Sequence, residues 1–201
     1  MLRRVGSGAE DAFLALVDRY HPTLLRVAQL WVPELDAAQQ VVRQSWREIL
    51  LRMDRFDAGA SLKSWLCGAL IRLARARAGV SADETANWLN EGAELPAVEP
   101  DRFSPPGDRW EGHWSSPPTD WPHMRDATRP APAGVNTELE AALASLPMGQ
   151  RVVIVLRDVE QLTSREVETL LSLSEPDQRT LLHRARSRVR ERLERYHGEG
   201  R

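Results

Sequence analysis

Apolar residues recur every three or four positions in three stretches of the N-terminal part of the chain, which places them on one face of successive helices. Pro33 separates the first two stretches. A glycine-containing loop at 54–61 precedes the third, and Ser61 can cap the helix that follows. We expect residues 9–79 to form a compact bundle of three to four helices. The apolar faces comprise Phe13, Leu16, Val17, Tyr20 and Leu24, then Val41, Val42, Trp46, Ile49 and Leu50, then Leu62, Leu66, Leu70 and Leu73.

Residues 80–136 lack this periodicity. The segment holds 9 of the 13 prolines and 4 of the 7 tryptophans, with 10 acidic and 4 basic side chains. Prolines remove backbone donors and block helical turns, so the composition predicts a long linker. Disordered linkers are usually poor in aromatic residues. Trp88, Trp110, Trp114 and Trp121 therefore either dock on a domain or a partner, or belong to a flexible chain, and composition leaves both open.

Helical spacing returns over residues 137–197, where the pattern predicts a domain of four helices. Thr163 and Glu166 stand at the spacing of a capping box and open a short helix. A tight turn follows, and Ser174 can cap a last helix from residue 175. The expected fold is therefore all-α, with two small helical domains joined by a Pro/Trp-rich linker.

The short helix, turn and last helix form a helix-turn-helix pattern, whose second helix enters the major groove of DNA and presents its first residues to base edges. Gln and Arg can bind adenine and guanine edges bidentately, and further arginines suit phosphates. An arginine-rich helix end is also typical of a solvated face favoured by the helix dipole, and spacing alone leaves both readings open. The candidate residues for duplex DNA are Ser174, Glu175, Asp177, Gln178, Arg179, His183, Arg184 and Arg186.

Charge is segregated along the chain, so the formal net charge of −2 conceals basic regions. Residues 1–79 carry 12 basic and 8 acidic side chains, and the stretch from Arg179 carries 8 and 3. The single cysteine, Cys67, lies in an apolar run and is expected to be a buried structural thiol. No histidine pair has metal-ligand spacing and no glycine-rich phosphate loop occurs. We therefore expect no enzyme activity, no metal and no cofactor.

Two segments resemble a known family. The run LPMGQRVVIVLRDVEQLT at 146–163 and the run LSLSEPDQRTLLHRAR at 171–186 resemble the C-terminal domain of extracytoplasmic-function sigma factors, within the sigma-70 family. The N-terminal part is similar to the other conserved domain of that family through Asp36-Ala-Ala, Trp46, Arg55-Phe56-Asp57 and the run SLKSWL at 61–66. The two matches occur in the family's order and cover about two thirds of the chain.

The resemblance implies a factor that carries core RNA polymerase to promoter DNA. The C-terminal domain would read the −35 element as duplex, and the N-terminal domain would bind polymerase and the melted −10 element. It also implies a possible anti-sigma factor as an inhibitory partner. The residues implied for the melted strand are Arg55, Phe56, Lys63, Trp65 and Arg72. Those implied for polymerase are Asp36, Gln39, Gln40, Arg43 and Gln44.

Some positions depart from the family's usual pattern. Gln39 and Gln40 stand where family members usually carry acidic residues, and an aromatic-Arg pair is typical where this chain has Cys67 and Gly68. An interface with fewer complementary charges loses steering and selectivity more than bulk affinity. These departures leave the polymerase and melted-strand contacts open.

Two other functions are compatible with the residues. A dimeric helix-turn-helix regulator that acts without polymerase would recognise two-fold symmetric sites. Alternatively, the Trp-rich linker would serve as an interaction module with no DNA binding. No apolar run approaches the about 20 residues of a membrane span, and no apolar signal core follows the first basic residues. We therefore expect a cytoplasmic protein without membrane insertion.

Overall fold

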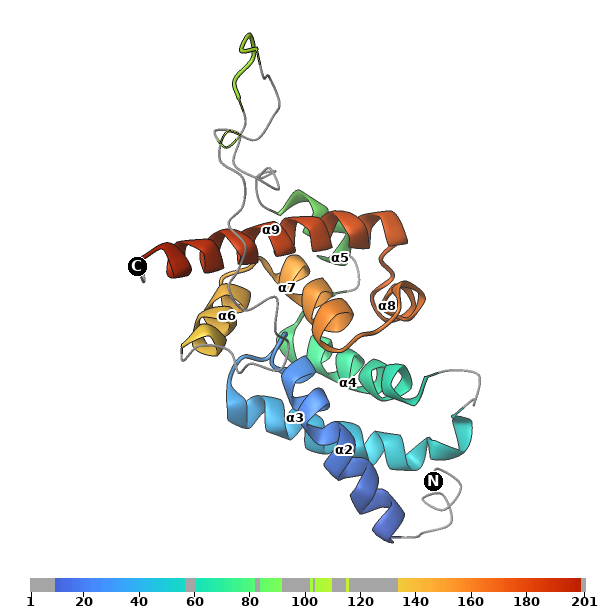
Figure 1. The fold of residues 1–201 in the computed structure, drawn as a ribbon. Coiled ribbons are helices and arrows are strands. Elements are labelled where there is room, and N and C mark those ends of the chain that lie inside the picture. The colour runs from blue at the N-terminus through green and yellow to red at the C-terminus, as the bar shows by residue number, and fades with distance from the viewer. Residues whose placement is uncertain are drawn as a thin grey trace.

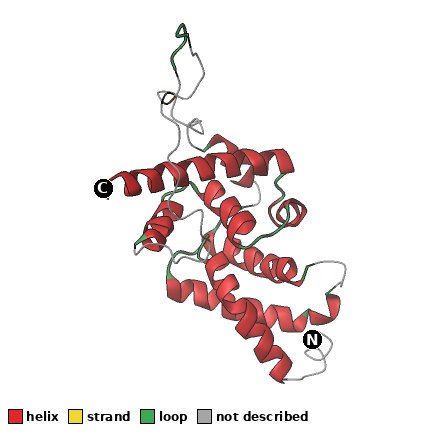
Figure 2. Ribbon diagram, in the orientation of Figure 1, coloured by secondary structure: helices red, strands yellow, loops and turns green. Residues whose placement is uncertain are grey.

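The computed structural model describes residues 10–56, 61–81, 84–91, 102, 104–109, 115 and 134–199. Within these residues every regular element is helical, as Figure 2 shows. This confirms the all-α class expected from the periodicity.

The N-terminal helices are α2 (Glu10–Ala28), α3 (Leu35–Leu51) and α4 (Leu62–Ala78), with a 3-10 turn at Met53–Arg55. Ser61 caps α4 as expected, because its side-chain oxygen accepts the backbone N–H of Ser64. Helix α4 ends at Gly79, whose φ of 70° lies in the left-handed region that glycine adopts without strain. The three helices pack on one another through the apolar faces that the sequence predicts, with the exception of Leu50. Leu50 is 44% exposed, so its predicted place on the buried face of α3 is wrong: it lies next to Ile49, and that residue takes the buried position.

The C-terminal helices are α6 (Val135–Ala144), α7 (Met148–Ile154), α8 (Ser164–Leu171) and α9 (Glu175–Glu199), and α7 continues as a π-helical turn at Val155–Val159. Helix α9 lies along α6 and α7 and packs against α8 at its N-terminal end (Figure 1). Its buried face includes Leu181, Leu182 and Ala185. The four helices expected from the sequence are therefore all present.

Part of the predicted linker docks on the C-terminal helices. A short helix α5 (Glu84–Asn87) leads into a 3-10 turn at Trp88–Asn90, and this turn packs against α7 and α9. The side chain of Trp88 lies directly over Gly149 in α7, and Trp88 is only 2% exposed. Docking is therefore the correct alternative for Trp88. Trp110, Trp114 and Trp121 lie outside the described residues.

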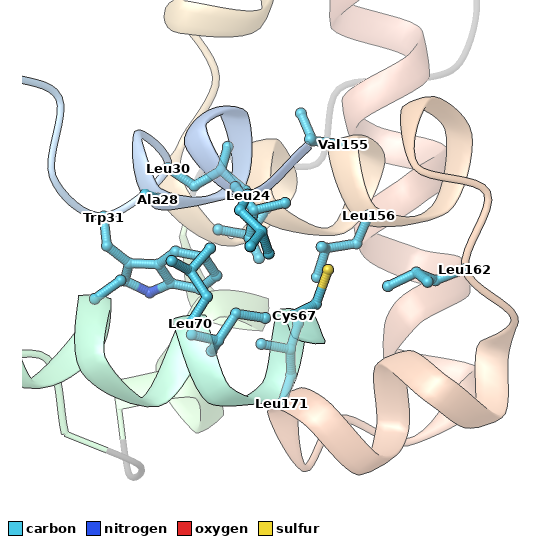
Figure 3. Close-up of a cluster of buried hydrophobic side chains, with 14 of the residues drawn as sticks. Leu24, Ala28, Leu30, Trp31, Cys67, Leu70, Val155, Leu156, Leu162 and Leu171 are labelled. Atoms are coloured by element: carbon cyan, nitrogen blue, oxygen red, sulfur yellow. The ribbon is translucent and has the colours of Figure 1, made fainter. Parts of the chain in front are cut away.

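The two sets of helices share one apolar core rather than standing apart. Figure 3 shows side chains of α2 and α4 meeting side chains of the π-helical turn and α8, with the sulfur of Cys67 pointing toward Leu156. Cys67 and Leu156 are fully buried, which confirms the structural reading of this thiol. Burying a leucine stabilises the folded state by about 1.5–3 kcal/mol relative to leaving it exposed, so this contact is substantial.

None of the described helices is both long and apolar enough to cross a membrane. Among the described residues, no group of three or more His, Cys, Asp and Glu side chains is arranged to hold a metal ion.

Replacing Gly149 by alanine should destabilise the protein. An added Cβ would lie 2.5 Å from both Cβ and Cγ of Trp88, so the indole or the helix must move. We expect a loss of about 1–3 kcal/mol in the free energy of unfolding, measured by denaturant titration. Gly68→Ala is the matched control, because its Cβ would meet only the end of the Leu170 side chain, at 3.2 Å. Equal stability of the two variants would contradict the close packing of Trp88.

Candidate nucleic-acid interface

The helix-turn-helix is built from local hydrogen bonds that the sequence predicts. Thr163 and Glu166 form a reciprocal capping box at the start of α8. Ser172 ends α8 with a φ of 56°. The side chain of Ser174 accepts the backbone N–H of Asp177 and donates to its carboxylate at 2.6 Å, so both residues cap α9. These bonds fix where α8 and α9 begin.

Gln178 closes the turn from inside. Its side-chain amide donates to the backbone oxygens of Ser164, at 3.0 Å, and Leu173, at 2.8 Å, and the residue is 1% exposed. The prediction that Gln178 reads a base edge is therefore wrong, because its donors hold the two helices together. Spacing alone did not reveal this, since a glutamine near the start of a recognition helix suits either role.

The exposed side of α9 carries four of the predicted duplex-contact residues. Glu175, Arg179, His183 and Arg186 follow one another at intervals of four, four and three and are all exposed. These intervals place them on one helical face. We call this set the α9 stripe. It is the part of the predicted site that the structure brings together at the surface.

Two of the α9 arginines predicted to contact duplex DNA have partners within the protein. Arg186 donates to both carboxylate oxygens of Asp158, at 2.7 and 2.8 Å, and this hydrogen-bonded pair raises the pKa of the guanidinium. More than half of the Arg186 side chain remains exposed, so it stays accessible. Arg184 is half-buried and donates to the backbone oxygen of Leu89 at 2.6 Å. Arg184 therefore contacts the docked segment beside α9, contrary to its predicted place among the duplex contacts.

The five candidates for the melted strand do not form a single group. The half-buried rings of Phe56 and Trp65 pack edge to face, with centroids 5.4 Å apart, next to the exposed Arg55. Arg72 pairs with Glu48 of α3 at 2.5 Å. Lys63 faces the C-terminal helices instead. Only Arg55, Phe56 and Trp65 therefore form a local group.

The polymerase candidates lie together on α3. Asp36, Gln40, Arg43 and Gln44 are exposed, and Gln39 is half-buried. Their intervals follow the helical period, so they occupy a side of α3 that the apolar core leaves uncovered.

A charged contact between the N-terminal and C-terminal helices was not foreseen from the sequence. Glu160, just after the π-helical turn, pairs with Arg26 of α2 and, at 2.7 Å, with Lys63 of α4. Its carboxylate also accepts the Thr23 hydroxyl at 3.1 Å, and its backbone oxygen accepts from Lys63 at 2.6 Å. The Glu160 side chain is 2% exposed. We call Glu160, Thr23, Arg26 and Lys63 the Glu160 cluster.

The environment of the Glu160 cluster changes two pKa values in opposite directions. Burial alone raises the pKa of Glu160, but hydrogen bonds and positive charge from Lys63, and then from Arg26, outweigh burial and bring it below its ordinary value of 4.5. Burial, aided by the negative charge of Glu160, raises the pKa of Cys67 to about 12. The carboxylate is therefore ionised and the thiol is neutral near pH 7.

Comparison with known proteins identifies the family. Residues 136–189, which include the helix-turn-helix and the α9 stripe, match the protein family described as "Sigma-70, region 4". The extracytoplasmic-function RNA polymerase sigma factor SigW of Bacillus subtilis (strain 168) is 22% identical over 196 residues, covering 96% of this chain and 94% of that protein. The chain is an extracytoplasmic-function sigma factor of the sigma-70 family.

This sigma factor also shares its fold with a solved structure. The sigma factor RpoE of Bartonella quintana, in complex with the anti-sigma factor NepR, has a TM-score of 0.58 and 18% identity, covering 91% of this chain and 97% of that one. Membership of the sigma-70 family assigns this sigma factor to promoter-specific transcription initiation in general, among non-enzymatic DNA-binding regulators.

Replacing Gln178 by alanine should lower stability rather than change DNA sequence preference. The change removes donors from two backbone oxygens at the turn between α8 and α9, and we expect a loss of about 1–3 kcal/mol in the free energy of unfolding. Denaturant titration measures this loss, and a promoter-variant binding series measures preference. A stable variant with altered preference at one base position would instead assign Gln178 to base reading.

The contribution of Glu160 to stability should depend on pH. Its folded pKa is below its ordinary value, so the ionised side chain stabilises the folded state above pH 4.5 and the contribution is lost as the pH falls through the folded pKa. We expect Glu160→Gln to lower the free energy of unfolding by about 1–2 kcal/mol at neutral pH, because both cationic partners are partly solvated. The difference from the unsubstituted protein should shrink as the pH falls below about 4.5 and disappear below the folded pKa of Glu160. A pH-independent difference would contradict this origin.

Proposed function

We propose that this sigma factor directs core RNA polymerase to specific promoters by reading the −35 element as duplex with the α9 stripe. The observation that carries the proposal is the placement of Arg179 and His183 on an exposed helical face directly after a capped turn. A recognition helix presents such residues to the major groove. Arg179 suits a guanine edge, and Arg186, which stays exposed beside Asp158, would contact a neighbouring phosphate.

The N-terminal helices would serve the melted −10 element and the polymerase. Arg55, Phe56 and Trp65 supply a cation next to an aromatic pair, a combination that suits a single strand. Lys63 and Arg72 would add charge once released from their present partners. The polymerase would bind α3 through the side that carries Asp36, Gln39, Gln40, Arg43 and Gln44.

An inhibitory protein partner is part of the proposal. The structurally similar RpoE of Bartonella quintana is held in a complex with an anti-sigma factor, and we propose that this chain also has such a partner. Together with its action on RNA polymerase, this would place the protein in the cytoplasm.

Arg179→Ala should weaken recognition at one base position of the upstream element. We expect a loss of about 1–3 kcal/mol there and little change at other positions, measured as run-off transcription with purified core polymerase on a promoter-variant library. Arg195→Ala is the matched control. Arg195 is exposed, pairs with Glu191, and lies about 24 Å from Arg179 along α9.

Two results would contradict the proposal. A loss spread evenly over all sequences would make Arg179 a phosphate contact. Absence of any polymerase-dependent transcript, together with tight binding to palindromic DNA by the protein alone, would favour a polymerase-independent dimeric regulator.

A further inference from the structure

Lys63 is the one lysine in the sequence. Its ammonium group contacts Glu160, a residue of the C-terminal part of the chain. An ammonium group has three hydrogen-bond donors. Glu160 receives two hydrogen-bonding contacts from Lys63, one at its backbone oxygen at 2.6 Å and one at its carboxylate at 2.7 Å. In this arrangement Lys63 has little capacity left for a phosphate or a base.

The surroundings of Glu160 are those of an anion site on the N-terminal helices. Thr23 and Arg26 of α2 and Lys63 of α4 all converge on its carboxylate. A hydroxyl and two cations are also the groups that bind a nucleic-acid phosphate. The Glu160 carboxylate is therefore surrounded by groups that also suit a phosphate.

Small residues next to Lys63 allow the C-terminal helices to approach closely. Cys67 is fully buried against them, and an added Cβ on Gly68 would lie 3.2 Å from Leu170 of α8. The apolar contact in Figure 3 and the Glu160 cluster are thus neighbouring parts of one interface. Because Cys67 is buried in the core shared with the C-terminal helices, movement of these helices away from Lys63 would also expose Cys67.

We propose that Glu160 is an intramolecular latch. Its carboxylate holds the C-terminal helices on the N-terminal helices and blocks Lys63, so that a single DNA strand must displace Glu160 before it can bind there. The latch rests on the proposed function only in assigning Lys63 to the melted strand; the closure itself does not depend on that assignment.

The latch predicts a measurable cost in DNA affinity. When only an open minority of molecules can bind, the apparent dissociation constant rises in inverse proportion to that minority. Weakening the Glu160 cluster should therefore tighten binding of a single strand without adding any contact to it.

The first experiment measures the affinity of the full-length protein for a fluorescent single-stranded oligonucleotide at low salt. We expect Glu160→Gln to bind about five- to tenfold more tightly than the unsubstituted protein. Arg26→Gln should gain less, because it weakens the same contact but also removes a cation from the anion site. The double variant should gain little more than Glu160→Gln alone, since both changes act on one contact. Arg26→Gln is informative because it removes a cation and yet is expected to improve DNA binding.

Two controls separate the latch from simpler effects. Glu191→Gln makes the same change of charge in α9, away from the interface, and should leave the affinity nearly unchanged. Ile49→Val removes a methyl group from the N-terminal core, and Ile49 is not part of the Glu160 cluster, so this variant reports the effect of lower stability alone. Tightening in either control equal to that in Glu160→Gln would overturn the latch.

The second experiment follows opening through Cys67, the only cysteine of the chain. The rate at which an excess of a thiol reagent modifies Cys67 should rise about five- to tenfold in Arg26→Gln, in which Glu160 remains beside the thiol. Saturating oligonucleotide should raise the rate in the unsubstituted protein, because a ligand of the open state also favours opening. Unchanged rates in both cases would overturn the latch.

The two experiments distinguish failure of the latch from failure of the proposed function. Faster Cys67 modification in Arg26→Gln, with no single-strand binding by any variant, would support closure by Glu160 and refute the melted-strand role of Lys63. Single-strand binding of equal strength in all variants, with Cys67 equally protected, would leave the DNA role intact and refute the latch.

Discussion

The arrangement of the whole molecule depends on one buried carboxylate. An ionised glutamate is costly to remove from water unless cations and donors surround it, and Glu160 finds them only on α2 and α4. Its burial is therefore possible only while the two groups of helices are in contact. The adjacent apolar contact holds the two groups of helices together. Glu160 fixes their relative position, because its carboxylate must reach both Lys63 and Arg26.

Much of the fold was predictable from local patterns. The capping residues Ser61, Thr163 and Ser174 act as the sequence suggested, because a cap depends on neighbours within three residues. The contact between Glu160 and Lys63 was not predictable, since the residues lie 97 positions apart. Nothing in the sequence around a charged residue indicates which distant residue it will pair with. Gln178 was misassigned for a related reason: its role depends on the angle between two helices.

The departures at Cys67 and Gly68 acquire a physical explanation. Family members usually have an aromatic-Arg pair where this chain has these two small residues, and here both lie under the C-terminal helices. A bulky pair at these positions would not fit beneath Leu170 and Leu156. The two small residues therefore leave room for the C-terminal helices on this side of α4. The exchange favours intramolecular closure over an open arrangement.

The docking of Trp88 changes which segment joins the two domains. Because Trp88 is anchored on α7, the path from N-terminal to C-terminal helices runs only from Ala78, the last residue of α4, to Glu84, the first of α5. Six residue steps span at most about 20 Å. The proline-rich stretch that follows Trp88 joins two elements that both pack on the C-terminal helices, the 3-10 turn at Trp88–Asn90 and α6, so its length adds nothing to the reach between domains. If the N-terminal and C-terminal helices separate further along a promoter, the Trp88 indole must leave its contact with Gly149. Trp88 therefore sets how far the two groups of helices can move apart.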